Sequence, residues 1–468
     1  MKLSQLQSLA GVGTLALRKD TDVKGLTRDS KAFKPGDLFL CRAGRRFDSH
    51  ALGAELAHKG ASGLVVHRDL DIPGANLWRV DPMEEGLIAA AFHGNPSHKL
   101  GVLGVTGTDG KSTTAFFTAQ LINAAGGRAA CLGTLGLWRK GTWQSGSLTT
   151  PEAETLQDVL AQLLREGHTH CAMEVSSHAL SYGRVAGTRF SSVGLTNLGR
   201  DHLDDYPSVE AYHQAKLRLF EIQSDPERQV RPASSPGKAR RVVGDSVKVE
   251  VLGPIGGGLK LQVALDGRTW MGIFPVGGAH NLENLAVALG LAAGAGVPAV
   301  DLLPGISTLQ SPPGRWQWLE SCRGQVMVDY AHTPQALELM LRNLRPHVKG
   351  RLSVVFGCGG DRDPLKRPLM GSIASTLADS AIVTDDNPRS EDPSVIRRQI
   401  LAGASRKPLR ECAPREAAIE MAVRELGPQD VLLIAGKGHE RVQVTREGSK
   451  PFDDAEVAAG VYRRQNAG

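Results

Sequence analysis

A glycine-rich segment with one lysine constrains the fold of this chain more than any other feature. It covers residues 104–114, Gly-Val-Thr-Gly-Thr-Asp-Gly-Lys-Ser-Thr-Thr, starts inside the apolar run 101–106 and leads into a helical pattern over 113–125. In a strand–turn–helix of this kind, backbone N–H groups and the helix start attract phosphate, the lysine reaches the outer phosphates, and a hydroxyl can touch Mg²⁺. The spacing departs from the strict phosphate-loop pattern, because Val105 stands where a glycine is expected. The segment predicts an ATP site that contains Gly107, Thr108, Asp109, Gly110, Lys111, Ser112 and Thr113.

The order of apolar runs predicts an α/β fold with three domains. Runs at 129–135, 171–175 and 192–196 alternate with helical patterns, as in a parallel sheet covered by helices. Period-two alternation within 247–274 predicts an antiparallel appendage, and Ser-Pro-Pro-Gly at 311–314 predicts a boundary. We expect a small α/β domain over 1–98, a central P-loop-type parallel-sheet ATPase domain over 99–311, and a Rossmann-like domain over 312–468.

Composition argues against several classes of protein. Hydrophobic residues make up 41% of the 468 residues, charged residues make up 22%, and no apolar run could span a bilayer. The net charge of +6 is dispersed, and aromatic residues make up only 5%, so a nucleic-acid partner is not expected. The start has no signal-peptide pattern, and the six cysteines have no metal spacing. We expect a cytoplasmic monomer without a membrane span, in which the polar stretch 224–241 is a mobile loop.

Polar residues follow several predicted strands. Glu174 lies at the end of the run 171–175, where open α/β sheets bind ligands, and its carboxylate suits Mg²⁺. Taken alone, Glu174 could equally form a salt bridge, His202 could be structural, and Lys216 could be an ordinary helix lysine. In the last block, four polar motifs stand at or beyond predicted strand ends, so the fold itself predicts that they meet in one crevice. These motifs cover 328–334, 356–363, 385–389 and 436–440.

These motifs together resemble the Mur ligase family, and within it the MurE type, over nearly the whole chain and in the same order. The resemblance rests on the glycine-rich segment 104–114, called the phosphate loop below, and on residues 92–97 before it. It also rests on Glu-Val-Ser-Ser-His at 174–178 and Asp-Asn-Pro-Arg at 386–389. It implies catalytic roles for Lys111 and a carbamylated Lys216, with two Mg²⁺ ions held by Ser112, Glu174, His202 and Lys216. It implies further ATP contacts at Asn281, Arg315 and Asp329, and contacts to a UDP-muramoyl dipeptide at Ser30, Thr149, Thr150, Ser176 and Arg184. It places a diamino acid against Arg362, Asp386, Asn387, Pro388, Arg389, Gly436 and Glu440.

The resemblance implies an ATP-dependent amide ligase of peptidoglycan synthesis. Such an enzyme joins a diamino acid to UDP-N-acetylmuramoyl-L-alanyl-D-glutamate through an acyl phosphate. Arg389 can bind the extra carboxylate of meso-diaminopimelate, although L-ornithine or L-lysine stays open as the substrate. A ligase like folylpolyglutamate synthetase is an alternative, and so is a simple phosphotransferase or a nucleotide-binding switch. The last two give no reason for Glu174, His202 and Lys216 to occur together.

Two segments depart from the family pattern. The stretch 228–241 is basic where acidic residues are usual. Trp316-Gln317 follows Gly314-Arg315 where Met or Phe and then Glu are commoner. Neither departure touches the predicted chemistry directly, and the second could change how the last domain hinges.

Overall fold

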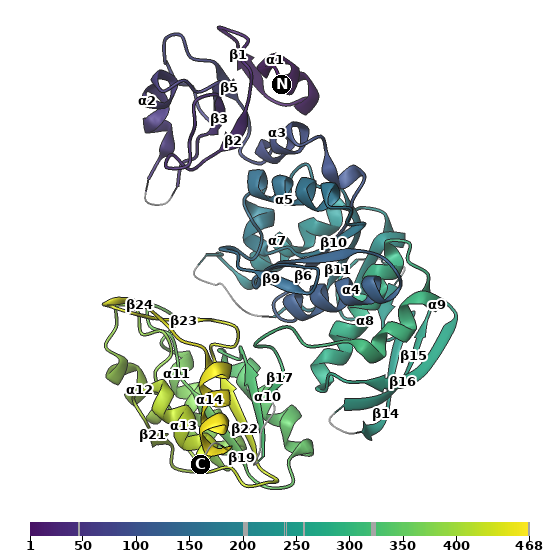
Figure 1. Ribbon diagram of the computed structural model, residues 1–468, viewed down its shortest axis with the longest axis vertical. Coiled ribbons are helices and arrows are strands. Elements are labelled where there is room, and N and C mark those ends of the chain that lie inside the picture. Colours follow the sequence, from purple (N-terminus) through teal and green to yellow (C-terminus); the bar gives the residue numbers. More distant parts are fainter. Residues whose placement is uncertain are drawn as a thin grey trace. The chain divides into compact units, whose positions relative to one another are not determined.

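The computed structural model describes residues 1–44, 47–199, 205–237, 239, 241–255, 258–319 and 324–466. These residues form three large sheets and a two-stranded ribbon (Figure 1). The chain divides into two compact units. One unit is Met1–Leu252, Leu261–Gly272 and Glu283–Leu309, and the other is Gly253–Lys260, Ile273–Leu282 and Gln310–Gly468. The predicted α/β fold is confirmed, whereas the domain boundaries at 98/99 and 311/312 stay predictions.

The first sheet is small and has a core on each face. Its order is β1-β5-β4-β3-β2, with β1 antiparallel to β5 and the other neighbours parallel. Side chains alternate along β3 (Asp37–Leu40), so Leu38 and Leu40 join one buried cluster with α1 and α3, and Phe39 joins another with α2. The remaining elements are β1 (Thr14–Ala16), β2 (Gly25–Thr27), β4 (Gly63–Val66), β5 (Leu77–Arg79), α1 (Leu3–Ala10), α2 (Gly53–His58) and α3 (Glu85–Phe92).

The middle sheet places the phosphate loop at its centre. The loop follows β6 (Gly101–Thr106), which pairs in parallel with β10 (His170–Glu174) and β11 (Phe190–Leu195). Helices α5 (Ala153–Arg165) and α7 (Val209–Ile222) pack against one face through a shared apolar cluster. Strand β6 is buried almost throughout, as expected for a parallel strand between helical layers, and the predicted run 101–106 is confirmed.

The same sheet has eleven strands and extends in both directions from this centre. Its order is β16-β15-β14-β13-β12-β11-β6-β10-β7-β8-β9. On one side β7 pairs in parallel with β10, and β8 and β9 continue as antiparallel strands. The elements not yet given are α4 (Lys111–Ala124), β7 (Ala129–Gly133), β8 (Gly136–Arg139), β9 (Thr142–Gln144), α6 (Ser177–Ser181), β12 (Gln229–Pro232), β13 (Arg241–Val243), β14 (Val247–Ile255), β15 (Gly258–Leu265), β16 (Arg268–Phe274), α8 (Ala279–Gly294) and α9 (Ala299–Leu302).

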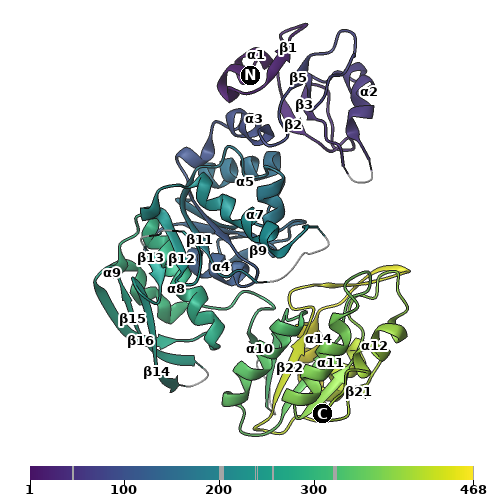
Figure 2. The same cartoon turned by 180° about the vertical axis from the view of Figure 1, so that it is seen from behind.

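The mobile loop predicted over 224–241 is wrong for part of its length. Residues 229–232 form β12, which pairs in parallel with β11 and β13, and Figure 2 shows β12 and β13 beside β11. Val230 is fully buried, Gln229 Nε2 donates to the carbonyl oxygens of Phe220 and Gln223, and the Arg231 guanidinium lies 3.7 Å from the Phe220 ring centroid. The polar composition misled the prediction because these side chains find partners inside the fold.

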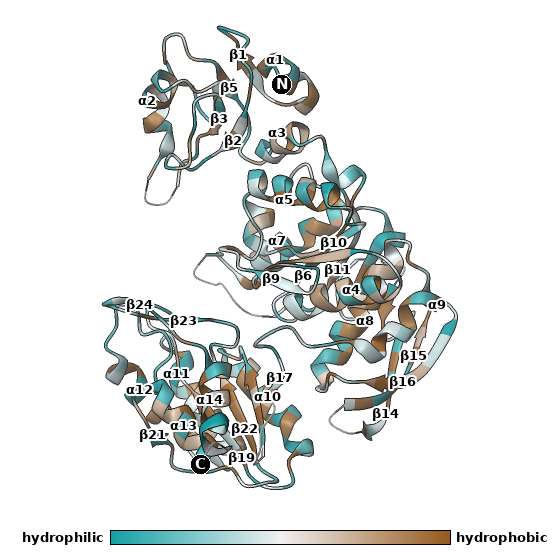
Figure 3. Ribbon diagram, in the orientation of Figure 1, coloured by the Kyte–Doolittle hydropathy of each residue, from teal (hydrophilic) through white to brown (hydrophobic). Residues whose placement is uncertain are grey.

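The last sheet is doubly wound, as predicted, and it also has one antiparallel edge strand that was not predicted. Its order is β17-β18-β22-β19-β20-β21, and apart from β17 its neighbours are parallel. Figure 3 shows its central strands as strongly apolar, in line with the buried cluster that they form with α13 and α14. The elements are β17 (Gln317–Leu319), β18 (Gln325–Asp329), α10 (Pro334–Leu344), β19 (Leu352–Phe356), α11 (Lys366–Leu377), β20 (Ser380–Val383), α12 (Pro393–Leu401), β21 (Arg410–Glu411), α13 (Arg415–Arg424), β22 (Val431–Ala435), β23 (Val442–Thr445), β24 (Gly448–Pro451) and α14 (Asp454–Asn466).

Within the described ranges, no helix combines the length and the apolar character that a membrane span requires. The described cysteines are free thiols, and four of the five are buried. The sixth, Cys322, lies outside the described residues.

Candidate active site

The phosphate loop is closed so tightly that two of its glycines cannot be replaced without a clash. Gly107 has φ +145°, and a Cβ there would lie 1.9 Å from Thr196 Oγ1. Gly110 has φ +81°, and a Cβ there would lie 2.2 Å from Asn284 Oδ1. Both the left-handed backbone and the close neighbours require glycine. The glycines that the sequence singled out therefore shape the loop.

The two lysines predicted as catalytic meet at one oxygen atom. Lys111 Nζ donates to the carbonyl oxygens of Gly107 and Thr108, at 2.9 and 2.7 Å. Lys216 Nζ, from the middle of α7, donates to the same Gly107 oxygen at 3.0 Å. Lys216 is 2% exposed, and its Nζ lies 3.8 Å from the centroid of the Tyr212 ring. The fold thus brings a residue 109 positions away from Gly107 onto the phosphate loop.

The loop backbone is held from the neighbouring strand. Asn197, just beyond β11, accepts hydrogen bonds at Oδ1 from the N–H groups of Thr108 and Asp109, at 3.2 and 3.0 Å. Helix α4 begins at Lys111 with Gly110 as its N-cap, and no side chain caps this end. Its first N–H groups and the helix dipole therefore give the loop positive potential. No role for Asn197 was predicted from the sequence.

Glu174 lies at the same edge of the sheet as the loop. It is the last residue of β10, opposite Val105 of β6, and it is 2% exposed. Its Oε1 accepts the Thr134 N–H at 2.8 Å, and its Oε2 accepts the Thr134 hydroxyl at 3.2 Å. A carboxylate with hydroxyl neighbours is a donor set that suits a hard cation.

A complete magnesium site is not described, because His202 lies outside the described residues. Among the residues that are described, no group of three or more His, Cys, Asp or Glu side chains could hold a metal. Oxygen donors that fit Mg²⁺ are nevertheless present, namely the Glu174 carboxylate and the hydroxyls of Ser112 and Thr113, both of which are buried.

Three of the residues predicted to contact a muramoyl substrate lie together beside Glu174. Thr150 Oγ1 donates to the Glu174 carbonyl oxygen at 2.9 Å and accepts the Ser176 N–H at 3.0 Å. Arg184 Nη1 donates to the Thr150 carbonyl oxygen at 3.3 Å. The neighbouring Thr149 places its hydroxyl 3.0 Å from that of Thr134. Ser30, the residue predicted in the first domain, is exposed.

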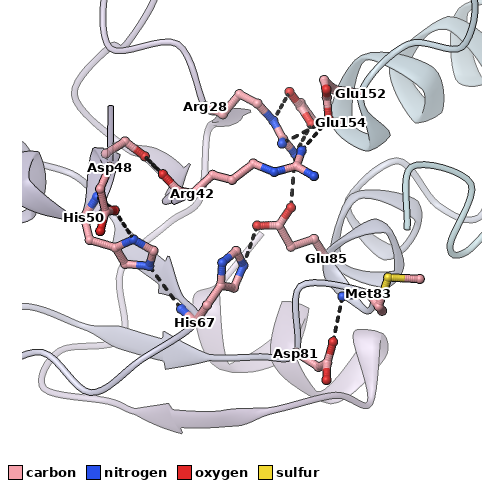
Figure 4. A network of polar contacts seen from close by, with 11 residues as sticks. Arg28, Arg42, Asp48, His50, His67, Asp81, Met83, Glu85, Glu152 and Glu154 are labelled. Atoms are coloured by element: carbon pink, nitrogen blue, oxygen red, sulfur yellow. Dashed lines mark hydrogen bonds and ion pairs between the residues drawn. The ribbon is translucent and has the colours of Figure 1, made fainter. Parts of the chain in front are cut away.

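A network of charged residues that the sequence did not predict joins the first sheet region to the middle one (Figure 4). Arg28 lies at its centre and forms ion pairs with Glu154 at 2.7 Å, Glu152 at 3.1 Å and Glu85 at 3.1 Å. Burial disfavours the charged guanidinium, but these three carboxylates raise the pKa of Arg28 above its ordinary value. His67 Nε2 lies 2.7 Å from the other Glu85 oxygen. The network fixes Arg28 in its charged form.

The residues predicted to contact ATP in the second unit are well ordered by local contacts. Asp329 ends β18 and accepts the N–H groups of Trp316 and Ala331, each at 2.8 Å. The Arg315 guanidinium lies 4.2 Å from the centroid of the Tyr330 ring. Asn281 is 1% exposed and donates from Nδ2 to the Gly277 carbonyl oxygen at 2.8 Å. Each of these side chains is therefore held in place within its own unit.

The Asp-Asn-Pro-Arg motif and the end of β22 form one polar cluster. Asn387 Nδ2 donates to Glu440 Oε2 at 2.6 Å, and Lys437 Nζ donates to Asn387 Oδ1 at 2.9 Å. Lys437 is fully buried, and its Nζ lies 3.2 Å from Glu440 Oε2. Asp386 packs against Gly436, where a Cβ would lie 2.8 Å from its Oδ2. Lys437 was not predicted as a site residue, although it lies within the motif 436–440.

Arg389 belongs to the same cluster, whereas Arg362 is exposed. Arg389 adopts φ +52°, uncommon for a residue with a side chain, and its Nη1 donates to the Gly360 carbonyl oxygen at 2.8 Å. Pro388 precedes it, and the Pro388 carbonyl approaches Gly360 so closely that a Cβ there would lie 2.0 Å from the oxygen. Nearby, burial and the charge of Arg315 lower the pKa of His439 to about 3, so this imidazole is neutral at physiological pH.

Two family models match the chain. Residues 105–292 match the Mur ligase middle domain, and residues 314–438 match the glutamate ligase domain of Mur ligases. UDP-N-acetylmuramoyl-L-alanyl-D-glutamate--2,6-diaminopimelate ligase of Bradyrhizobium diazoefficiens is 39% identical over 460 residues, which cover 94% of each chain. The enzyme of the same name from Mesorhizobium japonicum is 38% identical over 99% of this chain and 100% of its own. A solved structure of a ligase with this name superposes with TM-score 0.70 and 28% identity, covering 98% of this chain and 99% of the other.

Proposed function

The chain belongs to the Mur ligase family, whose members are ATP-dependent ligases, and from this premise we propose that it joins meso-diaminopimelate to UDP-N-acetylmuramoyl-L-alanyl-D-glutamate in peptidoglycan synthesis. The observation that carries the proposal is the meeting of Lys111 and Lys216 on the Gly107 carbonyl oxygen. Glu174 lies at the same sheet edge, and Thr150, Ser176 and Arg184 lie beside it. This arrangement provides for a triphosphate and an anionic acceptor at adjacent positions.

Chemistry of this kind begins with phosphoryl transfer from ATP to the D-glutamyl carboxylate. Lys111 and the N–H groups at the start of α4 would bind the phosphates and offset the charge that builds up in the transition state. Arg184 would orient the acceptor against the loop. The incoming amine then attacks the acyl phosphate, the amide forms, and phosphate leaves.

Mg²⁺ fits the oxygen donors at the edge of the middle sheet where Glu174 and the phosphate loop lie. Glu174, Ser112 and a carbamylated Lys216 would hold it, with His202 as a further ligand, and the family resemblance suggests two ions. When bound, the metal neutralises phosphate oxygens and orients them. A carbamate on Lys216 keeps one N–H, so it is compatible with the bond to the Gly107 carbonyl, and its negative charge would support a cation.

The polar cluster of the second unit supports meso-diaminopimelate as the amine. Its carboxylate and ammonium need partners of opposite charge, which Arg389 and Glu440 can supply. Asn387 can donate to the carboxylate from Nδ2 or accept from the ammonium at Oδ1. L-Lysine and L-ornithine lack the distal carboxylate. They would leave the arginine without its anion, a cost that enforces selection. Gly436, Asp386 and Pro388 shape this cluster, and Arg362 would complete the binding of the amine.

The remaining ATP contacts and the location of the enzyme also belong to the proposal. Asn281, Arg315 and Asp329 would bind the adenosine, and Ser30, Thr149 and Thr150 the UDP-muramoyl dipeptide. The domains would divide at 98/99 and 311/312. The ligase would act as a monomer in the cytoplasm, where ATP and nucleotide precursors are available.

Phosphate release from ATP tests the proposal. We expect release to require both UDP-N-acetylmuramoyl-L-alanyl-D-glutamate and the amine, with kcat/KM at least about 100-fold higher for meso-diaminopimelate than for L-lysine or L-ornithine. Mass spectrometry should find one amide product per phosphate. Phosphate release that needs no amine would indicate a nucleotide switch. Formation of ADP with the phosphoryl group kept on an acceptor and no free phosphate would indicate a phosphotransferase. Release with a folate acceptor and L-glutamate would indicate the folylpolyglutamate alternative.

A further inference from the structure

Glu152 binds three arginines from three segments of the chain. Its Oε2 accepts Arg42 Nη1 at 2.8 Å and Arg28 Nη1 at 3.1 Å. Its Oε1 lies 2.8 Å from Arg184 Nη2. Arg28 and Arg42 belong to the first sheet region and Arg184 to the middle one, so a single carboxylate joins charges across this junction.

This carboxylate lies next to the proposed acceptor site. Glu152 follows the turn Thr149-Thr150-Pro151, and Arg184 also donates to the Thr150 carbonyl oxygen at 3.3 Å. The guanidinium groups of Arg42 and Arg184 lie 5.4 and 5.9 Å from the centroid of the same Tyr182 ring. Glu152 and Tyr182 together therefore fix where these two guanidinium groups lie.

The three carboxylates of the junction are not equivalent. Arg28 also pairs with Glu154 and Glu85, so it stays neutralised when Glu152 is removed. The ion pairs described for Arg42 and Arg184 are both with Glu152. The side chain of Glu152 is only 20% exposed, and that of Arg184 15%, so water screens these pairs incompletely.

We propose that Glu152 is a positioning residue for the nucleotide substrate. Its carboxylate holds Arg42 and Arg184 at a fixed separation against their mutual repulsion. These two guanidinium groups, which share this one carboxylate, receive an anionic group of the UDP-linked acceptor. The inference rests on the proposed function and deepens it, because it names a residue that prepares the acceptor site without touching the reacting atoms.

The test compares Glu152→Gln with Glu154→Gln in the full-length enzyme. Both variants remove a carboxylate that binds Arg28, but only the first also removes the partner of Arg42 and Arg184. We expect Glu152→Gln to raise KM for the UDP-linked acceptor about tenfold, with kcat and the KM values for ATP and the amine within about twofold of wild type. Glu154→Gln should leave all KM values within about twofold.

Further measurements separate positioning from a structural role. Tm should fall in both variants, and further in Glu152→Gln, because the ion pairs described for Glu152 are with three arginines and those described for Glu154 are with Arg28 alone. Glu152→Asp keeps the charge on a shorter side chain, so its KM should lie between those of wild type and Glu152→Gln.

Equal KM shifts for Glu152→Gln and Glu154→Gln would overturn the inference, and so would a lower KM in Glu152→Gln, which would mean that Glu152 competes with the substrate. Wild-type enzyme without amine-dependent phosphate release would instead refute the proposed function, and the inference with it.

Discussion

The phosphate loop and the charged junction around Arg28 handle positive charge in opposite ways. At the loop, Lys111 and Lys216 donate to the uncharged carbonyl oxygen of Gly107. At the junction, the Arg28 guanidinium pairs with Glu85, Glu152 and Glu154. Both regions lie in the same unit of the structure, so they can be compared directly.

The difference indicates what each region is suited to do. A carbonyl oxygen is a weaker partner for an ammonium than a phosphate oxygen, so a triphosphate can take over Lys111 at little cost. A partly buried guanidinium with three carboxylates is expensive to disturb, so Arg28 fixes the junction. Substitutions at the loop should therefore impair chemistry more than stability, and substitutions at the junction should do the reverse.

The largest effect is expected for Lys111→Ala. Removing this ammonium takes away one of the groups that offset the transition-state charge on the phosphates, and kcat should fall about 1,000-fold. Tm should change little, because the hydrogen bonds described for Lys111 are local ones, to carbonyl oxygens three and four positions earlier in the same loop. Steady-state phosphate release and a thermal melt check both points, with the exposed Lys99→Ala as the control. Full activity in Lys111→Ala would contradict the contrast between the two regions.

Lys216→Arg tests whether the second lysine acts as a carbamate. Arginine keeps a positive charge in α7 but cannot take up CO₂ to become the proposed metal-binding anion, so kcat should fall about 100-fold. After exchange with ¹³C-bicarbonate, the NMR spectrum of wild type should contain a carbamate signal that this variant lacks. The same spectrum in both proteins, or unchanged turnover in the variant, would show that Lys216 acts in another form.

Gly107→Ala and Gly126→Ala separate loop geometry from backbone strain. Both glycines have positive φ, but a Cβ on Gly107 meets Thr196 Oγ1 at 1.9 Å, whereas nothing lies within 4 Å of a Cβ on Gly126. We expect Gly107→Ala to lower the free energy of unfolding by about 2 kcal/mol and to weaken nucleotide binding. Gly126→Ala should lower the free energy of unfolding by about 1 kcal/mol and leave the affinity for ADP unchanged. Calorimetric titration with ADP would measure the affinities, and equal affinities would count against the loop geometry.

The smallest effect is expected for Glu85→Gln, at the junction. Burial alone would raise the pKa of Glu85, but the hydrogen bond from His67 and the charge of Arg28 lower it below the ordinary 4.5. A carboxylate with a lowered pKa stabilises the fold above its unfolded pKa and loses that contribution as pH falls. Glu85→Gln should lower the free energy of unfolding by about 1 kcal/mol at pH 7, with turnover nearly unchanged.

Urea unfolding at a series of pH values checks this prediction. The difference between wild type and Glu85→Gln should shrink as pH drops below about 4.5, the ordinary pKa. A difference that stays constant down to pH 3 would mean that the carboxylate charge is not what stabilises the junction.

The sequence correctly predicted the strand–turn–helix around residues 104–114, but it did not predict the junction, for a physical reason. Gly107, Gly110 and Lys111 are adjacent in the chain, and a strand–turn–helix pattern determines their geometry locally. Arg28 and Glu154 are 126 positions apart, and nothing in either local pattern indicates that they pair. Lys216 is an intermediate case, because its local sequence gave no sign of a catalytic role and only the family resemblance implied one.

The fold shows the same division. Apolar runs such as 101–106 and 171–175 predicted β6 and β10, because their hydrophobic composition indicates that they are buried. The polar strand β12 was not predicted, because the burial of Gln229 and Arg231 depends on contacts with Phe220 and Gln223 that their own sequence does not indicate. Sequence patterns indicate burial by hydrophobicity more readily than burial by hydrogen bonds.

The central claim is that the protein forms the amide through an acyl phosphate. The most direct test follows an oxygen atom from the acceptor carboxylate to the released phosphate. The D-glutamyl carboxylate of the acceptor is labelled with ¹⁸O, and the phosphate released with meso-diaminopimelate is analysed by mass spectrometry. If the carboxylate attacks ATP, each phosphate will carry one ¹⁸O atom, and one amide will form per labelled phosphate. Unlabelled phosphate, released while the acceptor keeps all of its label, would contradict the account.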